Sequence, residues 1–396
     1  MRHAAFLGGT GSGKTTLALT CIEQLLLLGV PAILVDRKGD LCSYARGSAW
    51  KPANDTAERM ERRAKLREAI DVAVFTPGTL PGSGRPLSIP IAPDGLGQLS
   101  SAERTQFANF SARSLGGLLS YKETPTDEQK VAILGQAIAV LSGLDKPVTI
   151  DTLIEIIDSA DPTLVNAIGK LDSKHFKDIV QRLQTLKLLR GTLFLEDAER
   201  LSAEALLGIG PTANGRTRLS IINTSFLGDG SIYWVAQFLL EISRYAVRNP
   251  KSQLQAIVMF DEADQYLPAQ SKPATKAPLE SLLKRARAAG IGLMLATQSP
   301  GDLDYKSRDQ ILSWFVGRIT QDTAIKKLEP LFSETKLDPR EKLGVQQSGQ
   351  FFAVCGQDVV QIKADLSLVG VEPLSSQEIL EVALASKGPV QAAIAN

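Results

Sequence analysis

A glycine-rich octapeptide near the N-terminus constrains the fold of this chain more than any other feature. Residues 8–15 have the sequence GGTGSGKT and match the pattern G-x-x-x-x-G-K-[S/T]. The short apolar run Ala4–Leu7 precedes them, and the stretch Thr15–Leu28 has a helical composition that ends at Gly29. The octapeptide therefore predicts a strand, a tight loop and a helix, which together form the first unit of an α/β fold.

The residue types in this loop suit the phosphates of a nucleotide such as ATP. Glycines allow backbone N–H groups to turn inward, and the following helix directs its positive dipole end to the same point. We expect Lys14 to reach the β and γ phosphates and the hydroxyl of Thr15 to bind Mg²⁺. The predicted nucleotide-binding set is Gly8, Gly9, Thr10, Gly11, Ser12, Gly13, Lys14, Thr15 and Thr16.

An acidic pair far along the chain predicts that the nucleotide is hydrolysed. The apolar run Ala256–Phe260 is followed directly by Asp261 and Glu262. Buried parallel strands bring the residues at their carboxyl ends to the sheet edge where ligands bind. We expect Asp261 to hold Mg²⁺ through water and Glu262 to act as general base on the attacking water. Many strands end in acids, so the prediction of an ATPase depends on the pair and the phosphate loop together.

Two further polar residues are candidates for the same reaction. Gln298 ends an apolar run that begins at Ile291, where it would contact the γ phosphate or the attacking water; a turn glutamine is the alternative. Arg287 lies on the preceding helix, and arginine can clamp a developing phosphoryl charge with two hydrogen bonds. We expect Arg287 to act on a neighbouring subunit. Arg285 is the second choice for this role, and Arg318 is a weaker candidate for a contact within the subunit.

The remaining pattern describes an α/β core that is interrupted by helices. Between about Ser100 and Leu207, apolar residues recur at helical spacing, separated by turn signals. We therefore expect a mainly parallel sheet with a helical insertion, divided as residues 1–95 (first part of the core), 96–215 (insertion) and 216–396 (second part of the core). Further strands are expected at 31–36, 72–75 and 219–224, helices at 232–247, 278–289 and 376–385, and a hairpin at 351–354 and 359–363.

Composition limits the classes of protein that remain. There are 44 basic and 43 acidic side chains, so any DNA contact must come from a local patch or an assembled surface. Cys21, Cys42 and Cys355 are far apart and form no CxxC pair, which argues against zinc and is typical of the reducing cytoplasm. Charged and turn residues interrupt the most apolar stretch, Leu17–Val35, so we expect no membrane insertion.

These residues, in this order, resemble the HerA/FtsK superfamily of DNA-pumping ATPases, and above all its HerA-like branch. The segment Asp36-Arg-Lys-Gly-Asp40 is a marked part of the likeness, because most P-loop families lack it. The likeness covers the core at both ends of the chain and is much weaker between about Trp50 and Thr217. Four stretches carry it: Gly8–Thr16, Val35–Leu41, Met259–Pro268, and Gly290–Asp304 with Arg287 before it.

The resemblance implies a RecA-like fold in a hexameric ring, with ATP between subunits and duplex DNA in the central pore. Arg287 matches the family's trans arginine finger, and Gln298 matches its sensor glutamine. HerA-like proteins often work with a nuclease in end resection or phage defence, which leaves a nuclease partner open. The sequence departs from the family in two places. Only Met1–Leu7 precedes the phosphate loop, where relatives carry a β-barrel that docks partners, and Asp264 stands where they usually carry histidine.

Three functions follow from these observations. The first is an ATP-driven translocase or helicase acting on duplex DNA. The second is a secretion or conjugation ATPase, and the third is an ATP-binding switch subunit of a defence complex. DNA-stimulated hydrolysis would distinguish the first from the others. Lys306 and Arg308, which follow Gln298, are the candidate DNA contacts.

Overall fold

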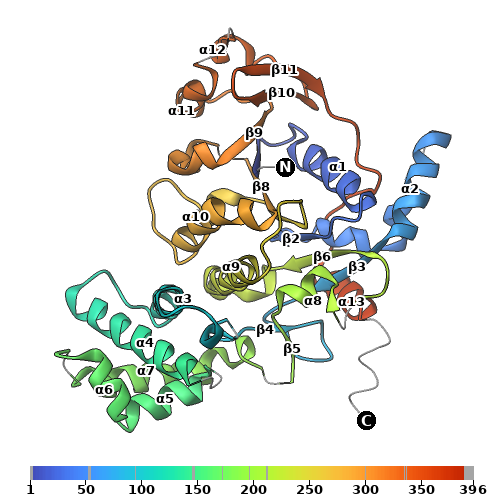
Figure 1. The fold of residues 1–396 in the computed structure, drawn as a ribbon. Helices are drawn as coiled ribbons and strands as arrows, with labels where there is room; N and C mark the ends of the chain where they lie inside the picture. The colour runs from blue at the N-terminus through green and yellow to red at the C-terminus, as the bar shows by residue number, and fades with distance from the viewer. Residues whose placement is uncertain are drawn as a thin grey trace.

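A nine-stranded sheet forms the centre of the computed structural model, in the order β11-β10-β9-β1-β8-β7-β2-β6-β3 (Figure 1). The structure describes residues 3–51, 55–93, 95–144, 148–171, 173–195, 197–210, 213–298, 300–333, 335 and 337–387. The seven strands from β9 to β3 are parallel, and β10 and β11 continue the sheet antiparallel. The strands are β1 (His3–Leu7), β2 (Ala32–Asp36), β3 (Ile70–Phe75), β6 (Thr217–Asn223), β7 (Ala256–Phe260), β8 (Ile291–Thr297), β9 (Ile311–Val316), β10 (Gln350–Cys355) and β11 (Asp358–Lys363).

Helices cover both faces of this sheet, as the apolar strands predict. Along β1, Ala4 and Phe6 belong to one hydrophobic core, while Ala5 and Leu7 belong to the other, because successive side chains point to opposite faces. Figure 1 shows α1, α2 and α13 on one side of the sheet and α9 and α10 on the other. Their bounds are α1 (Lys14–Leu27), α2 (Ala57–Ala69), α9 (Ser231–Arg248), α10 (Lys276–Arg285) and α13 (Ser376–Ala385).

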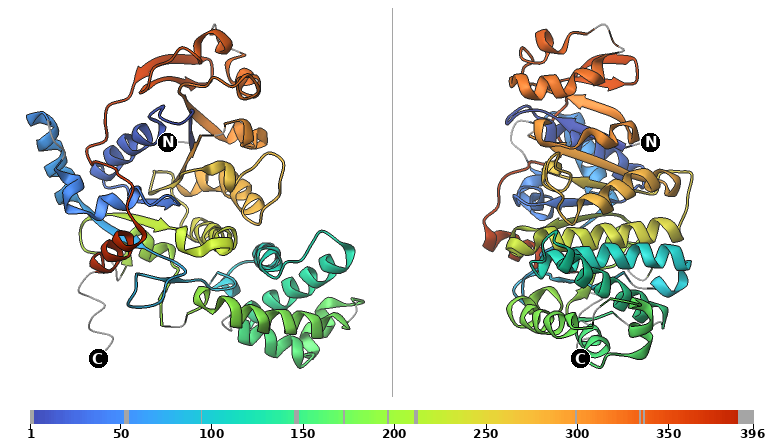
Figure 2. Two further views of the ribbon diagram at one scale, coloured as in Figure 1. Left: turned by 180° about the vertical axis from the view of Figure 1, so that it is seen from behind. Right: turned by 90° about the vertical axis from the view of Figure 1, so that its left-hand side faces the viewer.

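A group of helices stands beside the core, in the stretch where the sequence predicts helices (Figure 2). It joins the core where α3 packs against α9. At its base, the two-residue strands β4 (Leu87–Ser88) and β5 (Glu199–Arg200) pair in parallel, and α8 (Ala203–Leu207) leads back to the sheet. Its treatment as a separate subdomain with bounds 96–215 stays a prediction. The helices are α3 (Ser101–Leu118), α4 (Pro125–Gly143), α5 (Ile150–Asp158), α6 (Pro162–Ile168) and α7 (His175–Arg190).

The C-terminal part contains the predicted hairpin and helix together with elements that the sequence analysis missed. Strands β10 and β11 pair throughout their length, and α13 has the predicted bounds. Strand β9 was not predicted, yet it lies beside β1 and joins the hairpin to the parallel sheet. Helices α11 (Asp322–Phe332) and α12 (Pro339–Lys342) follow it. Among the described residues, we find no helix whose length and hydropathy would let it cross a bilayer.

Candidate nucleotide site

The phosphate loop connects β1 to α1, and its glycines are required by its shape. Gly11 and Gly13 have φ values of 74° and 88°, a region that other residues rarely adopt. A Cβ added at Gly8 would lie 2.5 Å from Ser12 Oγ. Gly13 is also the N-cap of α1 and offers no side-chain cap, so the first N–H groups of the helix are left to an anion.

Neighbouring strands hold the loop in this shape. The N–H of Gly9 donates to the carbonyl oxygen of Arg318, just after β9, at 3.0 Å. The N–H of Gly349, just before β10, donates to the carbonyl oxygen of Ser12 at 2.9 Å. The missed strand β9 therefore contributes to the site. Arg318 contacts the loop through its backbone, and its side chain is exposed.

Lys14 and Asp261 are both buried at the carboxyl edge of the sheet. Their exposed fractions are 6% and 3%. Burial lowers the pKa of Lys14 and raises that of Asp261, and the attraction between the two charges opposes both shifts. Oδ1 of Asp261 has no hydrogen-bond partner among the described residues. An orphaned buried oxygen costs roughly 1–3 kcal/mol, which points to a ligand or water that completes the site.

The donor set at this edge fits a magnesium ion that is shared with phosphate. Among the described residues, no group of three or more His, Cys, Asp or Glu side chains could hold a metal by itself. Mg²⁺ in nucleotide sites takes only one or two protein oxygens and completes its shell with water and phosphate. The hydroxyl of Thr15 and the orphaned carboxylate of Asp261 are oxygens of that kind.

Glu262 is held by two side chains that the sequence analysis did not assign to the site. Its Oε1 lies 2.9 Å from Nζ of Lys38, and its Oε2 accepts a hydrogen bond of 2.8 Å from Nε2 of Gln265. Arg37 donates in turn to Oε1 of Gln265. The backbone of Glu262 has φ 59°, and non-glycine residues in this region are often functional. The carboxylate is thus fixed in position at the sheet edge.

Lys38 reaches Glu262 because Asp36 shapes the turn after β2, which lies beside β7. Oδ1 of Asp36 accepts the N–H groups of Lys38 and Gly39, each at 3.0 Å. Gly39 has φ 87°, and an added Cβ would lie 2.5 Å from Cδ1 of Ile379. Burial, followed by the charge of Asp40, raises the pKa of Asp36 to about 7. The marked Asp36–Asp40 segment therefore builds one side of the site.

Gln298 lies where the sequence predicts, at the end of β8, between the strands that carry the phosphate loop and Asp261. Its Oε1 accepts a hydrogen bond of 2.9 Å from Oγ1 of Thr10. The preceding Thr297 donates to Oδ1 of Asp264. Asp264, which departs from the family pattern, thus links the turn that follows β7 to the end of β8. Through neighbouring residues at the end of β8, these two bonds connect the phosphate loop with this turn.

Arg287, by contrast, lies at the opposite edge of the sheet, where the parallel strands begin. It precedes β8, which runs parallel to β1 with Leu7 opposite Thr297. The seven residues of β8 span roughly 23 Å at about 3.3 Å per residue. Burial lowers the pKa of His3, and the charge of Arg287 contributes to this shift, which places Arg287 near the start of β1. The exposed Arg287 side chain therefore cannot reach its own phosphate loop.

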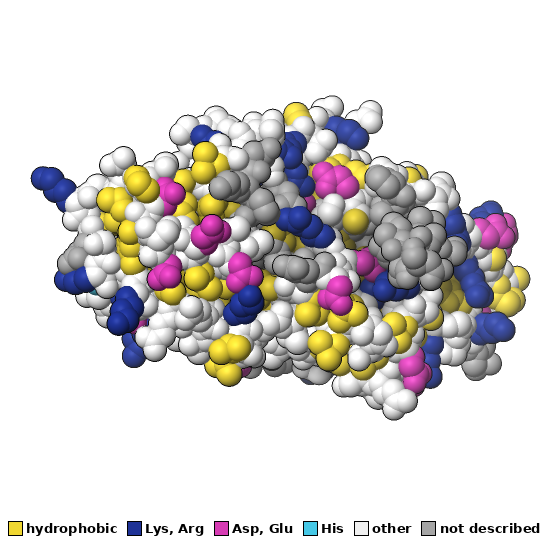
Figure 3. Space-filling view, turned by 90° about the horizontal axis from the view of Figure 1, so that it is seen from below, with side chains coloured by type: hydrophobic (Ala, Val, Ile, Leu, Met, Phe, Trp, Pro, Cys, Tyr) yellow, Lys and Arg dark blue, Asp and Glu magenta, His cyan; other side chains and the backbone are white. Residues whose placement is uncertain are grey.

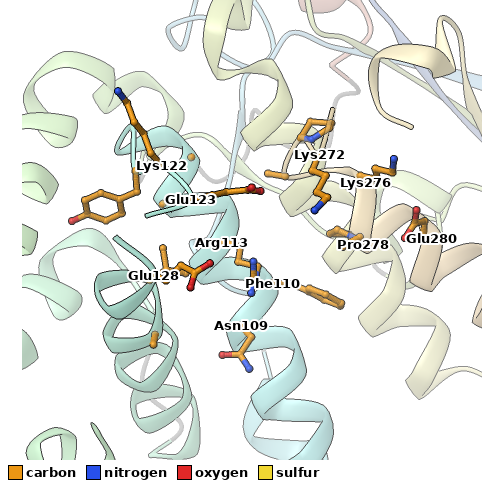
Figure 4. A pocket seen from close by; sticks show the side chains of 18 of the residues that line it. Asn109, Phe110, Arg113, Lys122, Glu123, Glu128, Lys272, Lys276, Pro278 and Glu280 are labelled. Carbon is orange, nitrogen blue, oxygen red and sulfur yellow. The ribbon is translucent and has the colours of Figure 1, made fainter. Parts of the chain in front are cut away.

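Arg285 and Lys306, two of the other basic candidates, have contacts elsewhere in the molecule. Arg285 donates to Oε1 of Gln106 in α3 at 2.8 Å. Lys306 lines a hollow of about 780 Å³ between α3, α4 and the start of α10, where both acidic and basic side chains gather (Figure 4). The side chain of Arg308 lies outside the described part. On the face shown in Figure 3, side chains of both charges are mixed, without one basic field.

Comparisons with known proteins agree with this geometry. The family model described as the central domain of helicase HerA matches residues 1–242. A search of curated proteins finds no match to the chain. The solved structure of VirB4 of Thermoanaerobacter pseudethanolicus is 14% identical, with a TM-score of 0.57, covering 95% of this chain and 91% of that chain.

The bacterial conjugative coupling protein TrwB has a similar fold. Its sulfate complex is 14% identical, with a TM-score of 0.60, covering 95% of this chain and 88% of that chain. A TrwB structure with ADP and Mg²⁺ is 13% identical, with a TM-score of 0.58 and the same coverage. These similarities confirm the predicted RecA-like P-loop fold. Because the family model covers more than half of its residues, the chain belongs to the helicase HerA central-domain family of P-loop ATPases.

Proposed function

We propose that the chain hydrolyses ATP with Mg²⁺ at this site and uses the energy to move duplex DNA through a ring of its own copies. The observation that carries the hydrolytic part is the meeting of three groups at one sheet edge. These are the buried ammonium of Lys14, the orphaned oxygen of Asp261 and the fixed carboxylate of Glu262. Each belongs to a different step of phosphoryl transfer to water.

The phosphates would be bound by the loop before any chemistry occurs. Backbone N–H groups of the loop and the start of α1 would surround them, and Lys14 would bind the β and γ phosphates. Thr15 and Asp261 would hold Mg²⁺, which neutralises the charge that develops on the phosphates when it is bound. Because the phosphate charges favour the protonated ammonium, nucleotide binding would reverse the effect of burial on the pKa of Lys14.

Glu262 would then take a proton from the water that attacks the γ phosphorus. The bond to the bridging oxygen breaks, and ADP and phosphate leave. Lys38 and Gln265 hold the carboxylate, so that little reorientation is needed when the water arrives. Gln298 would contact the γ phosphate or the water in place of Thr10, and would signal the state of the nucleotide to Asp264 through Thr297.

The ring part of the proposal is supported by the position of Arg287. Its side chain is exposed at the sheet edge away from its own phosphate loop, so only a second copy could bring it to a γ phosphate. A closed ring in which every site receives Arg287 from its neighbour satisfies this requirement for all subunits. The number six comes from the family resemblance, and duplex DNA would pass through the centre.

ATP hydrolysis with and without linear duplex DNA tests this function. The rate would be measured at low and moderate salt, because phosphate contacts weaken as salt rises. The variant Glu262→Gln serves as the blank. A severalfold stimulation by DNA is expected. Hydrolysis that is present but indifferent to DNA would contradict the translocase and favour one of the two alternatives.

The alternatives predict different partners. A secretion or conjugation ATPase would work with an envelope complex, and the structurally similar TrwB is described as a bacterial conjugative coupling protein. A switch subunit would hydrolyse ATP slowly and assemble in an ATP-dependent way. A nuclease partner, which the family resemblance leaves open, would co-purify with the chain in the presence of ATP. A cytoplasmic location is common to all of them.

A further inference from the structure

The nine-stranded sheet ends at β3, which lies beside α13 (Figure 1). This strand pairs with β6 alone, in an unbroken parallel register, so its other side is an outer edge of the sheet. On that edge, the N–H of Val74 donates to Oγ of Ser386, just after α13, at 3.0 Å. An extended residue directs its N–H and C=O to one side, and the next residue directs them to the other. Because Val74 faces outward, Val72 faces outward as well.

The backbone at Val72 lies between two covered positions of this edge. Just after β3, the N–H of Thr76 donates to the carbonyl oxygen of Arg85 at 2.8 Å. At the start of β3, the N–H of Ile70 donates to the carbonyl oxygen of Leu66 in the last turn of α2. Within the described part of the chain, the outward N–H and C=O of Val72 have no hydrogen-bond partner. Free backbone groups on an edge strand are the groups that pair with an added strand.

A cavity of about 290 Å³ opens at this stretch of the edge. Its walls are the start of β3, the segment 44–50 and the end of α13. Trp50 and Ile70 are buried in these walls, and Val382 and Ala385 of α13 complete an apolar lining next to Val72. An extended segment on this edge would therefore have an apolar surface for the side chains on one of its faces.

Two arginines give the cavity an uncompensated positive charge. The guanidinium of Arg67 lies over the ring of Trp50, 6.0 Å from its centroid. Arg216 donates to backbone carbonyl oxygens at the end of α2. Neither guanidinium lies within salt-bridge distance of a carboxylate of the described residues, whereas the other charged lining residues, Arg46 and Asp71, already have partners of opposite sign. The cavity therefore favours carboxylates as its ligands.

We propose that this edge of β3 binds an extended, acidic segment of a partner protein, which adds a strand to the sheet. The N–H and C=O of Val72 pair with the backbone of the segment. Its apolar side chains pack against Trp50 and Val382, and its carboxylates pair with Arg67 and Arg216. The surface uses none of the residues that we propose for hydrolysis, so it goes beyond the function proposed above and is independent of it.

Fluorescence anisotropy with labelled peptides tests the charge requirement. The first probe is an N-acetylated hexapeptide in which glutamate and valine alternate, and the second has glutamine in place of each glutamate. We expect the acidic probe to bind the natural chain and the glutamine probe to bind at least about tenfold more weakly. Equal binding of the two probes, or no binding of the acidic probe, would overturn the proposal.

Two further probes test the addition of a strand. One is the acidic peptide with a methyl group on each valine nitrogen, and the other carries the methyl groups on the glutamate nitrogens. Successive N–H groups of an extended chain point to opposite edges, so one set faces Val72 and the other faces solvent. One of these probes should lose binding and the other should keep it. Equal binding of both methylated probes would show that no strand is added.

Variants of the chain locate the binding site. Arg216→Gln should weaken binding of the acidic probe about fivefold, and the control Arg340→Gln, which removes an exposed arginine of α12, should leave it unchanged. Val72→Pro removes the outward N–H but no bond to β6, because proline is tolerated where an edge strand faces solvent. It should abolish binding, with the Tm and the rate of ATP hydrolysis of the natural chain. Normal binding of the acidic probe to Arg216→Gln would overturn the proposal even if Val72→Pro fails to fold.

Two other roles of this edge give different results in the same experiments. If the arginines served only to prevent association between edges, Arg216→Gln would form larger assemblies in light scattering, and no probe would bind the natural chain. If the edge paired with a second copy of the chain, Val72→Pro would lower the oligomeric state, again without binding of a probe. Either result would overturn the proposal.

Discussion

Nζ of Lys38 and Oε1 of Glu262 lie 2.9 Å apart, although 224 positions of sequence separate the two residues. They meet because β2 and β7 are adjacent parallel strands that end at the same edge of the sheet. The side chain of Lys38 is 39% exposed and that of Glu262 is 20% exposed, so solvent weakens this pair and its effect on stability is small. Its importance lies in the position that it gives to the candidate general base.

The first prediction concerns this pair. The variant Lys38→Met keeps much of the side-chain volume but leaves Glu262 held by Gln265 alone. We expect the turnover number for ATP to fall about tenfold, because the base is less well oriented, with little change in KM. Steady-state phosphate release measures both constants. Lys38→Arg restores the charge and should recover part of the rate, whereas an unchanged turnover in Lys38→Met would exclude the positioning role.

The second prediction is that Arg287 acts on a neighbouring subunit. Arg287→Ala and Glu262→Gln should each be inactive alone, because each removes one half of every site. When the two proteins are mixed in equal amounts and reassembled, about a quarter of the interfaces should contain both an intact Glu262 and an intact Arg287. Hydrolysis should therefore return in the mixture. If the mixture stays inactive although mixed rings form, Arg287 has no such role.

The third prediction concerns pH and Asp36. Its pKa of about 7 in the folded chain lies above the ordinary 3.8, so the folded state binds the proton more tightly than the unfolded state. The stabilisation that this proton gives to the folded state is complete below pH 3.8. It is lost as the pH rises through 7, and the free energy of unfolding then falls by at most about 4 kcal/mol. Asp36→Asn keeps an acceptor oxygen without the titration. Between pH 5 and 7.5, the Tm of the natural chain should therefore fall relative to that of the variant.

The matched control for this prediction is Asp358→Asn, which changes an exposed carboxylate at the start of β11. Its Tm should follow the natural chain at both pH values. Asp40 and Asp261 face Asp36, and their charges raise its pKa, so they are kept unchanged in every protein compared. Parallel Tm curves for Asp36→Asn and the natural chain would show that Asp36 does not titrate in this range.

The fourth prediction concerns the turn that carries Arg287 into β8. Gly290 has φ 66°, and an added Cβ would lie 2.0 Å from the carbonyl oxygen of Gln253. Gly290→Ala should lower the free energy of unfolding by at least about 2 kcal/mol. Gly117, in α3, has open space around it, and Gly117→Ala should raise that free energy by about 0.5–1 kcal/mol. Urea denaturation compares the two, and equal effects would contradict the account of the turn.

The sequence predicted the local parts of the site well, because each is encoded by a short run of residues. The phosphate loop needs its glycines at fixed spacing, and Asp261 follows an unbroken apolar strand, so both lie next to the elements that the sequence predicts, while their roles stay predictions. The partner of Glu262 was missed, because nothing within the segment Asp36–Asp40 shows which strand will lie beside β2. The order of strands in the sheet decides that contact.

The same reason explains the other omissions. Strand β9 was missed, although it is an apolar run. Its place in the sheet depends on pairing with β1, which lies more than 300 residues earlier. The cavity beside the first turn of α1 joins Thr15 to Leu366, and its walls exist only after the segment between β11 and α13 has folded back onto α1. By contrast, the exposed position of Arg287 agrees with its predicted action on a neighbour, and that role stays a prediction.

Magnesium-dependent release of phosphate from ATP, measured for the natural chain and for Glu262→Gln, tests the central claim most directly. The natural chain should turn over ATP, and the variant should be slower by roughly a hundredfold or more while it binds ATP with similar affinity. That result would establish Glu262 as the general base at a site built by Lys14 and Asp261. Equal rates of the two proteins, or loss of ATP binding in the variant, would contradict the account.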